Sequence, residues 1–268
     1  MHKQKYQVNI SRDISIEVYD EGVGPLIILL PSLGRGAKDL EELAVPLALE
    51  GYRVLRPEPR GNAASNGPLE NKTLHDWASD IAAVISQANQ DPAWVVGHAH
   101  GNWIARTVAT DYPHLVKGLI LLAASAGKVP KGSNALPIPP EIRIAIENCA
   151  RPEITDDQRL VFLQEAFFAP GNDAKSWLTG WNFDLMQIQT ATQRRTPIDE
   201  FFYGGIAPIL NIQAKYDVIA PPAYANVLSD YLGDRVTNVQ IDHAGHALIP
   251  EQCQAVIEAI LTYIRRTL

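Results

Sequence analysis

The sequence predicts an α/β protein with a mostly parallel, doubly wound sheet and a helical insertion. Short apolar segments alternate with amphipathic helical patterns along most of the chain, which is typical of βαβ units. The apolar segment Leu26–Leu30 is uninterrupted, as expected of a strand that is buried on both faces. The alternation stops at residue 128 and resumes after residue 205. We therefore expect a core domain formed by residues 1–127 and 206–268, with residues 128–205 inserted as a helical cap.

The first half of the chain contains most of the expected sheet. Residues 6–10 and 14–18 alternate apolar and polar side chains around a turn-prone Ser-Arg-Asp sequence, which indicates a hairpin at a sheet edge. Buried strands and covering helices then follow each other in turn. The expected strands are residues 26–30, 52–55, 93–96 and 119–123, and the expected helices are residues 37–50, 74–88 and 102–110.

The predicted cap, residues 128–205, is too long for an unstructured loop and contains helical patterns broken by Pro and Gly. The expected helices are residues 140–150, 156–169 and 175–193. The segment is rich in aromatic residues, namely Phe167, Phe168, Trp177, Trp181 and Phe183. These side chains could line a pocket, or Trp177 and Trp181, four positions apart, could attach one helix to the core. Beyond the cap we expect strands at residues 209–213 and 236–241 and helices at residues 222–232 and 250–266.

Composition excludes several classes of protein. The chain has 268 residues, of which 46% are hydrophobic and 20% charged, as in ordinary globular domains. The net charge of -7 has the wrong sign for holding a phosphate backbone, so no nucleic acid is expected. Cys149 and Cys253 form no C-x-x-C pattern that would indicate a zinc ribbon or a disulfide framework. Without a signal peptide or a membrane span, a cytoplasmic protein with no membrane partner is expected, and its assembly could include a homodimer.

One turn carries the strongest functional signal. Residues 95–101 (VVGHAHG) take a buried strand into a helix through a turn that has glycine on both sides. This is the setting of the nucleophile elbow, G-x-S-x-G, in which a strained residue projects its side chain into the site. The chain therefore resembles the α/β-hydrolase superfamily, with Ala99 at the nucleophile position. The resemblance covers essentially the whole chain and implies an α/β-hydrolase fold with a helical cap.

Two further residues match the catalytic triad of that superfamily. Asp217 follows the strand after the cap, where members carry the acid, and His246 lies in the loop before the last helix, where they carry the base. The order of positions 99, 217 and 246 agrees with the order of the fold. An alternative role for Asp217 is to cap the helix that begins near Pro221.

The resemblance also implies the remaining parts of the site. The oxyanion hole would use the backbone N–H groups of His100 and Leu33. Many members have His-Gly where this chain has Ser32-Leu33. Two alternatives are open for Ser32, a hydroxyl that bonds its own backbone or a contact with substrate. We expect a small apolar or aromatic carbonyl substrate. The expected substrate contacts are Ser32, Trp103, Trp177 and Trp181.

No cofactor and no metal are expected. Four of the seven histidines, His98, His100, His243 and His246, fall in the two loops of the predicted site. Because His98 and His100 flank a tight turn, they should point in different directions and not toward one metal ion.

Alanine at the elbow leaves three explanations open, because a methyl group cannot form an acyl-enzyme. Ala99 could be an engineered replacement of serine, in a hydrolase that acts on an ester, a lactone or a related carbonyl compound. It could be natural, with His246 and Asp217 acting as a general base. Residues 98–103 (HAHGNW) resemble the S-H-G-x-W run of cofactor-independent ring-cleaving dioxygenases, so a dioxygenase or lyase based on this dyad is the second hypothesis. The third is a non-catalytic ligand-binding pseudoenzyme on the same fold.

Overall fold

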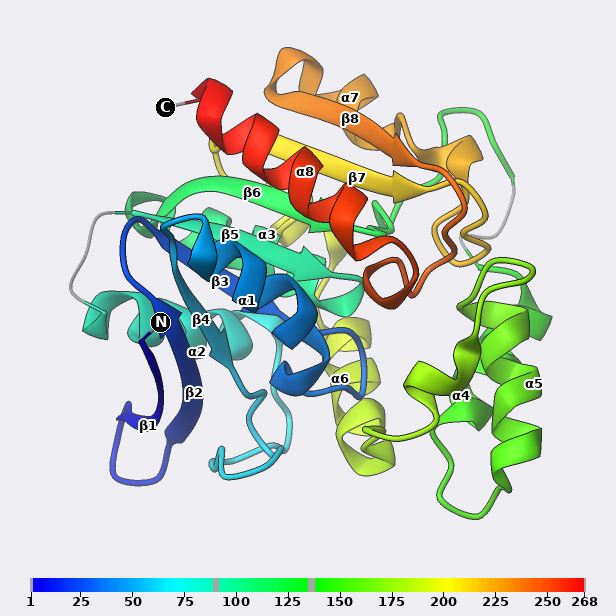
Figure 1. Cartoon of the computed structure of the whole chain (residues 1–268), viewed down its shortest axis with the longest axis horizontal. Helices are drawn as coiled ribbons and strands as arrows, with labels where there is room; N and C mark the ends of the chain where they lie inside the picture. Colours follow the sequence, from blue (N-terminus) through cyan, green and yellow to red (C-terminus); the bar gives the residue numbers. More distant parts are fainter. Residues whose placement is uncertain (1, 89–91, 135–137, 268) are drawn as a thin grey trace.

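The computed structural model describes residues 2–88, 92–134 and 138–267 and contains one twisted sheet (Figure 1). Its strands lie in the order β1-β2-β4-β3-β5-β6-β7-β8. Their bounds are β1 (Lys3–Asn9), β2 (Ser15–Gly22), β3 (Leu26–Leu30), β4 (Arg53–Pro57), β5 (Ala93–His98), β6 (Val116–Leu122), β7 (Ile209–Ala214) and β8 (Val236–Ile241). β2 pairs antiparallel with β1 and with β4, and all other pairs are parallel. The predicted mostly parallel α/β sheet and its edge hairpin are therefore confirmed.

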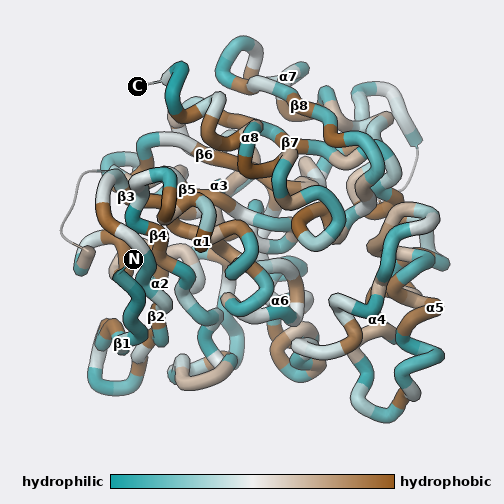
Figure 2. The backbone as a smooth tube through the Cα atoms, viewed as in Figure 1, coloured by the Kyte–Doolittle hydropathy of each residue, from teal (hydrophilic) through white to brown (hydrophobic). Residues whose placement is uncertain are grey.

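Helices cover both faces of this sheet. They are α1 (Glu41–Leu49), α2 (Leu74–Gln87), α3 (His100–Asp111), α7 (Val227–Leu232) and α8 (Ile249–Thr267). Along β3, Ile27 and Leu29 pack with α1 and α8, while Ile28 and Leu30 pack with α2 and α3. Both faces of the strand are thus buried, which explains its unbroken apolar sequence. Figure 2 shows hydrophobic residues concentrated in the central strands, with hydrophobic and hydrophilic residues mixed along the helices.

The segment between β6 and β7 contains α4 (Pro140–Cys149), α5 (Asp156–Ala166) and α6 (Phe183–Arg195). α4 and α5 pack against each other and lie beside the sheet, beyond the ends of β7 and β8 in Figure 1. We call residues 128–205 the cap segment.

The single helix predicted over residues 175–193 is wrong. A 3-10 turn, Ala174–Trp177, is separated from α6 by a turn at Gly180, whose φ of +86° favours glycine. α6 then starts anew, because the Asn182 side chain accepts a hydrogen bond from the N–H of Leu185. Trp177 and Trp181 consequently do not share a helix.

Two other predicted helices begin with a 3-10 turn. Residues 37–50 form the turn Ala37–Leu40 before α1, and residues 222–232 form the turn Pro222–Tyr224 before α7. In the first, the carbonyl of Ala37 accepts a hydrogen bond from the buried guanidinium of Arg56, at 2.9 Å.

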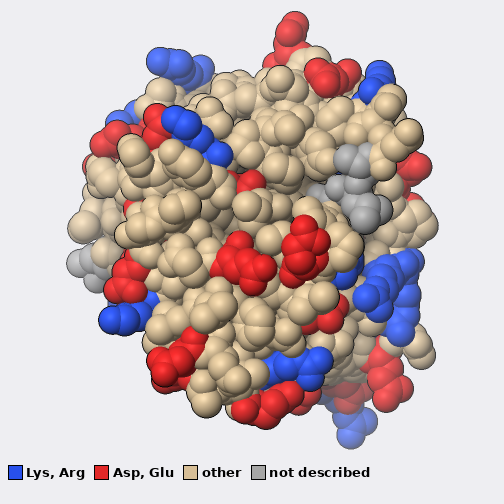
Figure 3. All heavy atoms as spheres, turned by 90° about the vertical axis from the view of Figure 1, so that its right-hand side faces the viewer, with Lys and Arg blue, Asp and Glu red and all other residues tan. Residues whose placement is uncertain are grey.

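The surface carries charges of both signs. On the face drawn in Figure 3, Lys and Arg side chains are scattered among Asp and Glu and form no continuous basic stripe. Within the described ranges, none of the helices has the length and apolar character required to cross a bilayer.

Candidate active site

The turn between β5 and α3 is strained at its tip. Ala99 has φ of 49° and ψ of -109°, a conformation that costs a non-glycine residue on the order of 1–3 kcal/mol. The flanking residues must be glycines because a side chain at either position would collide with the backbone. A Cβ on Gly97 would lie 2.3 Å from the carbonyl oxygen of Gly101, and a Cβ on Gly101 would lie 2.4 Å from that of Leu30. The backbone thus has the form of an elbow that presents a side chain, although the side chain at its tip is only a methyl group.

His246 and Asp217 meet beside this turn. The Nδ1 atom of His246 lies 2.8 Å from Oδ2 of Asp217, so the expected hydrogen bond is present. The other carboxylate oxygen accepts hydrogen bonds from the N–H groups of Ile219 and Ala220, both at 2.8 Å. Asp217 therefore caps the following turn and also orients His246. Because a carboxylate only accepts hydrogen bonds, Nδ1 must donate, which leaves Nε2 as the atom available to a substrate.

The two histidines that flank Ala99 point in different directions, as expected. Nε2 of His98 lies 2.9 Å from the carbonyl oxygen of His246 and so supports the loop of the base. Nδ1 of His100 lies 2.6 Å from Nε2 of Gln193 in α6. Burial lowers the pKa of His98 to about 4 and that of His100 to about 3, so both rings are neutral near pH 7. Over the described ranges, no three His, Cys, Asp or Glu side chains are grouped to hold a metal ion.

Two residues near Ala99 have backbone N–H groups without a partner in the described chain. Neither the N–H of Leu33 nor that of His100 donates a hydrogen bond to another described residue. α6 holds the loop that carries Leu33. Its Gln189 accepts a buried hydrogen bond from the N–H of Gly34 at 2.7 Å, and the N–H of Asn182 donates to the carbonyl of Gly34 at 2.9 Å.

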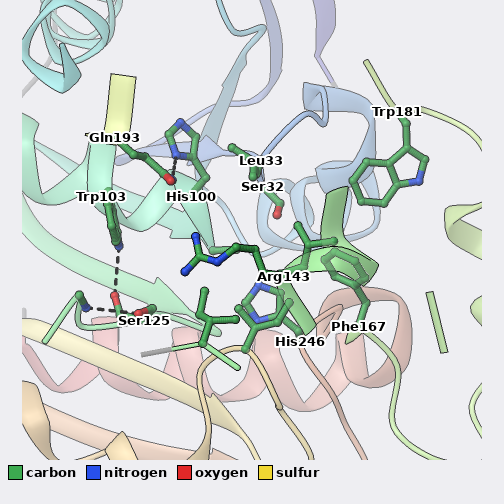
Figure 4. Close-up of a pocket in the computed structure, with 15 residues that line it drawn as sticks. Ser32, Leu33, His100, Trp103, Ser125, Arg143, Phe167, Trp181, Gln193 and His246 are labelled. Atoms are coloured by element: carbon green, nitrogen blue, oxygen red, sulfur yellow. Dashed lines mark hydrogen bonds between the residues drawn. The ribbon is translucent and has the colours of Figure 1, made fainter. Parts of the chain in front are cut away.

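A cavity of about 270 Å³ lies over Ala99, between the sheet and the cap segment (Figure 4). The core contributes one wall, which is formed by Ser32, Leu33, Ala99, His100, Trp103, Ser125, Gly127, Ile219 and His246. The cap segment contributes the other wall, which is formed by Ile138, Arg143, Ile146, Phe167, Trp181 and Gln193. The cavity thus brings together groups from the carboxyl ends of the strands, where ligands of open α/β sheets bind.

Comparison with known proteins agrees with the observed fold. The family model described as alpha/beta hydrolase fold matches residues 25–143. The solved esterase EaEST from Exiguobacterium antarcticum superposes with a TM-score of 0.81, at 20% identity, over 98% of this chain and 100% of that chain. The chain has the α/β-hydrolase fold.

Curated relatives in this superfamily carry different activities in their names. A Mycobacterium tuberculosis protein named as a non-heme bromoperoxidase, BpoC, is 25% identical over 93% of this chain and 97% of its own length. The 2-(acetamidomethylene)succinate hydrolase of Mesorhizobium japonicum is 28% identical over 43% of this chain and 41% of its own length.

The structure corrects one expected substrate contact of this α/β-hydrolase. Trp177 does not line the cavity. Its ring stacks on the guanidinium of Arg35, 4.7 Å from the ring centre, and packs against Phe167 and Phe168 in the core of the cap segment. Trp181, on the other side of Arg35 at 4.5 Å, does line the cavity.

Ser32 and Trp103 line the cavity, as the sequence predicts for substrate contacts. The Ser32 hydroxyl forms no hydrogen bond with its own backbone or with another described residue, so the alternative for that residue is wrong. Its oxygen faces the cavity in Figure 4.

Sequence reasoning missed three polar residues of the cap segment that act at this site. Arg143, Gln189 and Gln193 lie in the cap segment, and only their contacts in the folded chain mark them. Their helical spacing could have placed Gln189 and Gln193, four apart, on one face of a helix. Nothing in the sequence says which face meets the core.

Proposed function

We propose that this α/β-hydrolase cleaves an ester, a lactone or a related carbonyl compound. The observation that carries the proposal is that His246, held by Asp217, lines one cavity over a strained elbow together with Leu33 and His100, whose backbone N–H groups are free. An oriented imidazole and preorganised N–H donors are what acyl transfer requires. Relatives and fold neighbours named as hydrolases and esterases support the same class of reaction.

With Ala99 in place, the nucleophile must be water. Nε2 of His246 takes a proton from the water while its oxygen attacks the substrate carbonyl carbon. The carbonyl oxygen becomes an oxyanion that accepts hydrogen bonds from the N–H groups of Leu33 and His100. The intermediate then collapses, the bond to the leaving group breaks, and His246 returns the proton to that group. Asp217 stabilises the charged imidazole in between.

If Ala99 replaces a serine, the same groups serve a covalent route. A serine hydroxyl at the tip of the elbow would give its proton to His246 while its oxygen attacks the substrate carbonyl carbon. The bond to the leaving group would then break, His246 would give the proton to that group, and water would hydrolyse the acyl-enzyme. In both routes we propose that the cap segment encloses the substrate and that Phe167 and Trp181 contact its apolar part.

A second candidate function is a cofactor-independent dioxygenase or lyase reaction. It is favoured by a specific observation, namely that the His246–Asp217 pair is complete while Ala99 offers no nucleophile. In this reaction His246 would remove a proton from an aromatic substrate. A ligand-binding protein without turnover is the third candidate.

The test compares the parent chain with Ala99→Ser on para-nitrophenyl esters, with nitrophenolate release as the measurement. A burst in the Ser variant alone supports a silenced serine hydrolase, and steady turnover in the parent supports the water route. Restoring a triad nucleophile should raise the rate by at least about 10²-fold, since its loss costs up to about 10⁶-fold in a serine protease. Turnover in neither protein would contradict the proposed hydrolysis and favour the other candidates.

A further inference from the structure

The cap wall of the cavity carries a cation without a partner. Arg143 lies on α4 and its side chain extends into the cavity, with the guanidinium in the space framed by His100, Trp103 and His246 (Figure 4). Within the part of the chain that the structure describes, this guanidinium forms no ion pair and no hydrogen bond.

Buried arginines of this chain are used differently. Arg35 pairs with Asp39 and stacks between two tryptophans, and buried Arg106 donates to backbone carbonyls. These guanidinium groups hold the fold together. Arg143 holds no part of it, so the five N–H donors of its side chain remain available to a ligand.

The rest of the cavity does not compensate this charge. None of the described residues that line it is an Asp or a Glu. The nearby carboxylate of Asp217 lies behind His246 and is fully engaged by the imidazole and two N–H groups. The lining His100 is neutral because burial lowers its pKa to about 3. Apart from the proposed base, Arg143 is therefore the charged group among the described lining residues.

The size and the apolar lining of the cavity further limit the kind of ligand that it can bind. Ile138, Ile146, Phe167 and Trp181 make the cap wall around Arg143 largely apolar. The volume of about 270 Å³ lies near the lower limit of the roughly 300–1,000 Å³ typical of small-molecule pockets. A planar guanidinium matches a carboxylate through two parallel hydrogen bonds.

We propose that Arg143 binds a carboxylate of the substrate, which makes the substrate a small acid with an apolar body and a cleavable carbonyl over Ala99. This inference rests on the proposed function in taking the cavity as the substrate site. The protein as a whole has a net charge of -7, which repels anions, so the attraction is local to this cavity.

Calorimetric titration of the parent chain with phenylacetate and with its uncharged analogue phenylacetamide tests the proposal. Binding needs no turnover, so its outcome is independent of the ester assay with Ala99→Ser. A hydrogen-bonded charge pair contributes about 1.5–3 kcal/mol, so the acid should bind at least about tenfold more tightly than the amide. Because the guanidinium is accessible to solvent, this preference should shrink as salt is added.

Variants identify the group responsible. Arg143→Met keeps the length of the side chain and should weaken phenylacetate binding at least about tenfold while leaving phenylacetamide unchanged. Arg143→Lys should restore part of the loss. The matched control is Arg194→Met, an exposed arginine of α6 that does not line the cavity. Equal affinities of the parent for acid and amide, no saturable binding of the acid, or an equal loss in the control would each overturn the proposal.

Discussion

The two walls of the cavity are built in different ways. On the core wall, backbone conformation and buried hydrogen bonds fix each group, as the strained Ala99 and the fully bonded Asp217 show. On the cap wall, Arg143 of α4 supplies the charge, Phe167 and Trp181 in turns next to the helices supply the aromatic surface, and Arg143 has no partner among the described residues. The difference teaches that internal hydrogen bonds hold the groups suited to reaction chemistry in place. The groups suited to substrate selection have few such bonds, so they can be substituted with little effect on the fold.

The largest expected effect comes from the core wall. His246→Ala should lower any turnover of the parent by about 10²- to 10⁴-fold, because general-base catalysis contributes that much. The measurement is the steady-state rate of ester cleavage, in the parent and in the Ala99→Ser background. The affinity for phenylacetate should change little, since Arg143 is intact. Turnover that survives in His246→Ala would contradict both the water route and the serine route.

Lowering the pH should lower the free energy of unfolding through the two buried histidines that flank Ala99. Unfolded histidines titrate near pH 6.5, whereas burial lowers the pKa of His98 to about 4 and of His100 to about 3. Between these values the unfolded chain binds more protons, so the free energy of unfolding falls as the pH falls. The two residues together should remove up to about 3 kcal/mol per pH unit.

Urea unfolding between about pH 7 and about pH 5 measures this slope. The upper part of the acid range is chosen because burial raises the pKa of carboxyls such as Glu58, which opposes the trend at lower pH. His100→Gln should make the slope shallower. The control is His243→Asn, an exposed residue with φ of +56° that asparagine also adopts, and its slope should match that of the parent. An unchanged slope in His100→Gln would show that His100 is not held neutral.

Removing the hydrogen bond that joins the two walls, from the Gly34 N–H to Gln189, should have a smaller effect on stability and turnover. Gln189→Met removes the acceptor of the buried Gly34 N–H, which should lower the free energy of unfolding by about 1–3 kcal/mol. The loop that carries the Leu33 N–H would also loosen, so kcat should fall several-fold with little change in KM in whichever form turns over. Gln187→Met, an exposed position on the same helix, is the control. If Gln189→Met and Gln187→Met are equally stable, the hydrogen bond from the Gly34 N–H to Gln189 does not stabilise the loop of the proposed oxyanion hole.

The difference between the two walls also explains which parts of the structure could be predicted from the sequence. Strands such as Leu26–Leu30 and Val236–Ile241 have the predicted bounds, because burial on the sheet and local turn residues determine them. The pairing of Asp217 with His246 was expected from the resemblance to α/β-hydrolases, and both residues lie in loops that follow neighbouring parallel strands. Local sequence patterns therefore account for the strands of the core wall, and the resemblance accounts for its paired side chains.

The cap wall is harder to predict, because its side chains are placed by contacts between helices distant in sequence. Trp177 and Trp181 were expected on one helix, but the turn at Gly180 separates them and Arg35, far away in the chain, decides which of them reaches the cavity. Arg143 carries no motif at all. Its meaning comes only from the absence of a carboxylate among its described neighbours.

The smallest expected effect tests whether strain at the elbow is real. Ala99→Gly should stabilise the protein by about 1 kcal/mol, because relief of roughly 1–3 kcal/mol of backbone strain exceeds the roughly 0.5–1 kcal/mol entropic cost of glycine. Turnover should change little, since the methyl group does no chemistry. The matched control is Ala109→Gly, inside α3, which should destabilise by about 1 kcal/mol because its backbone is helical. Urea midpoints of both variants give the two signs directly. If Ala99→Gly destabilises as much as Ala109→Gly, the elbow stores no strain, and the core wall is held by its hydrogen bonds alone.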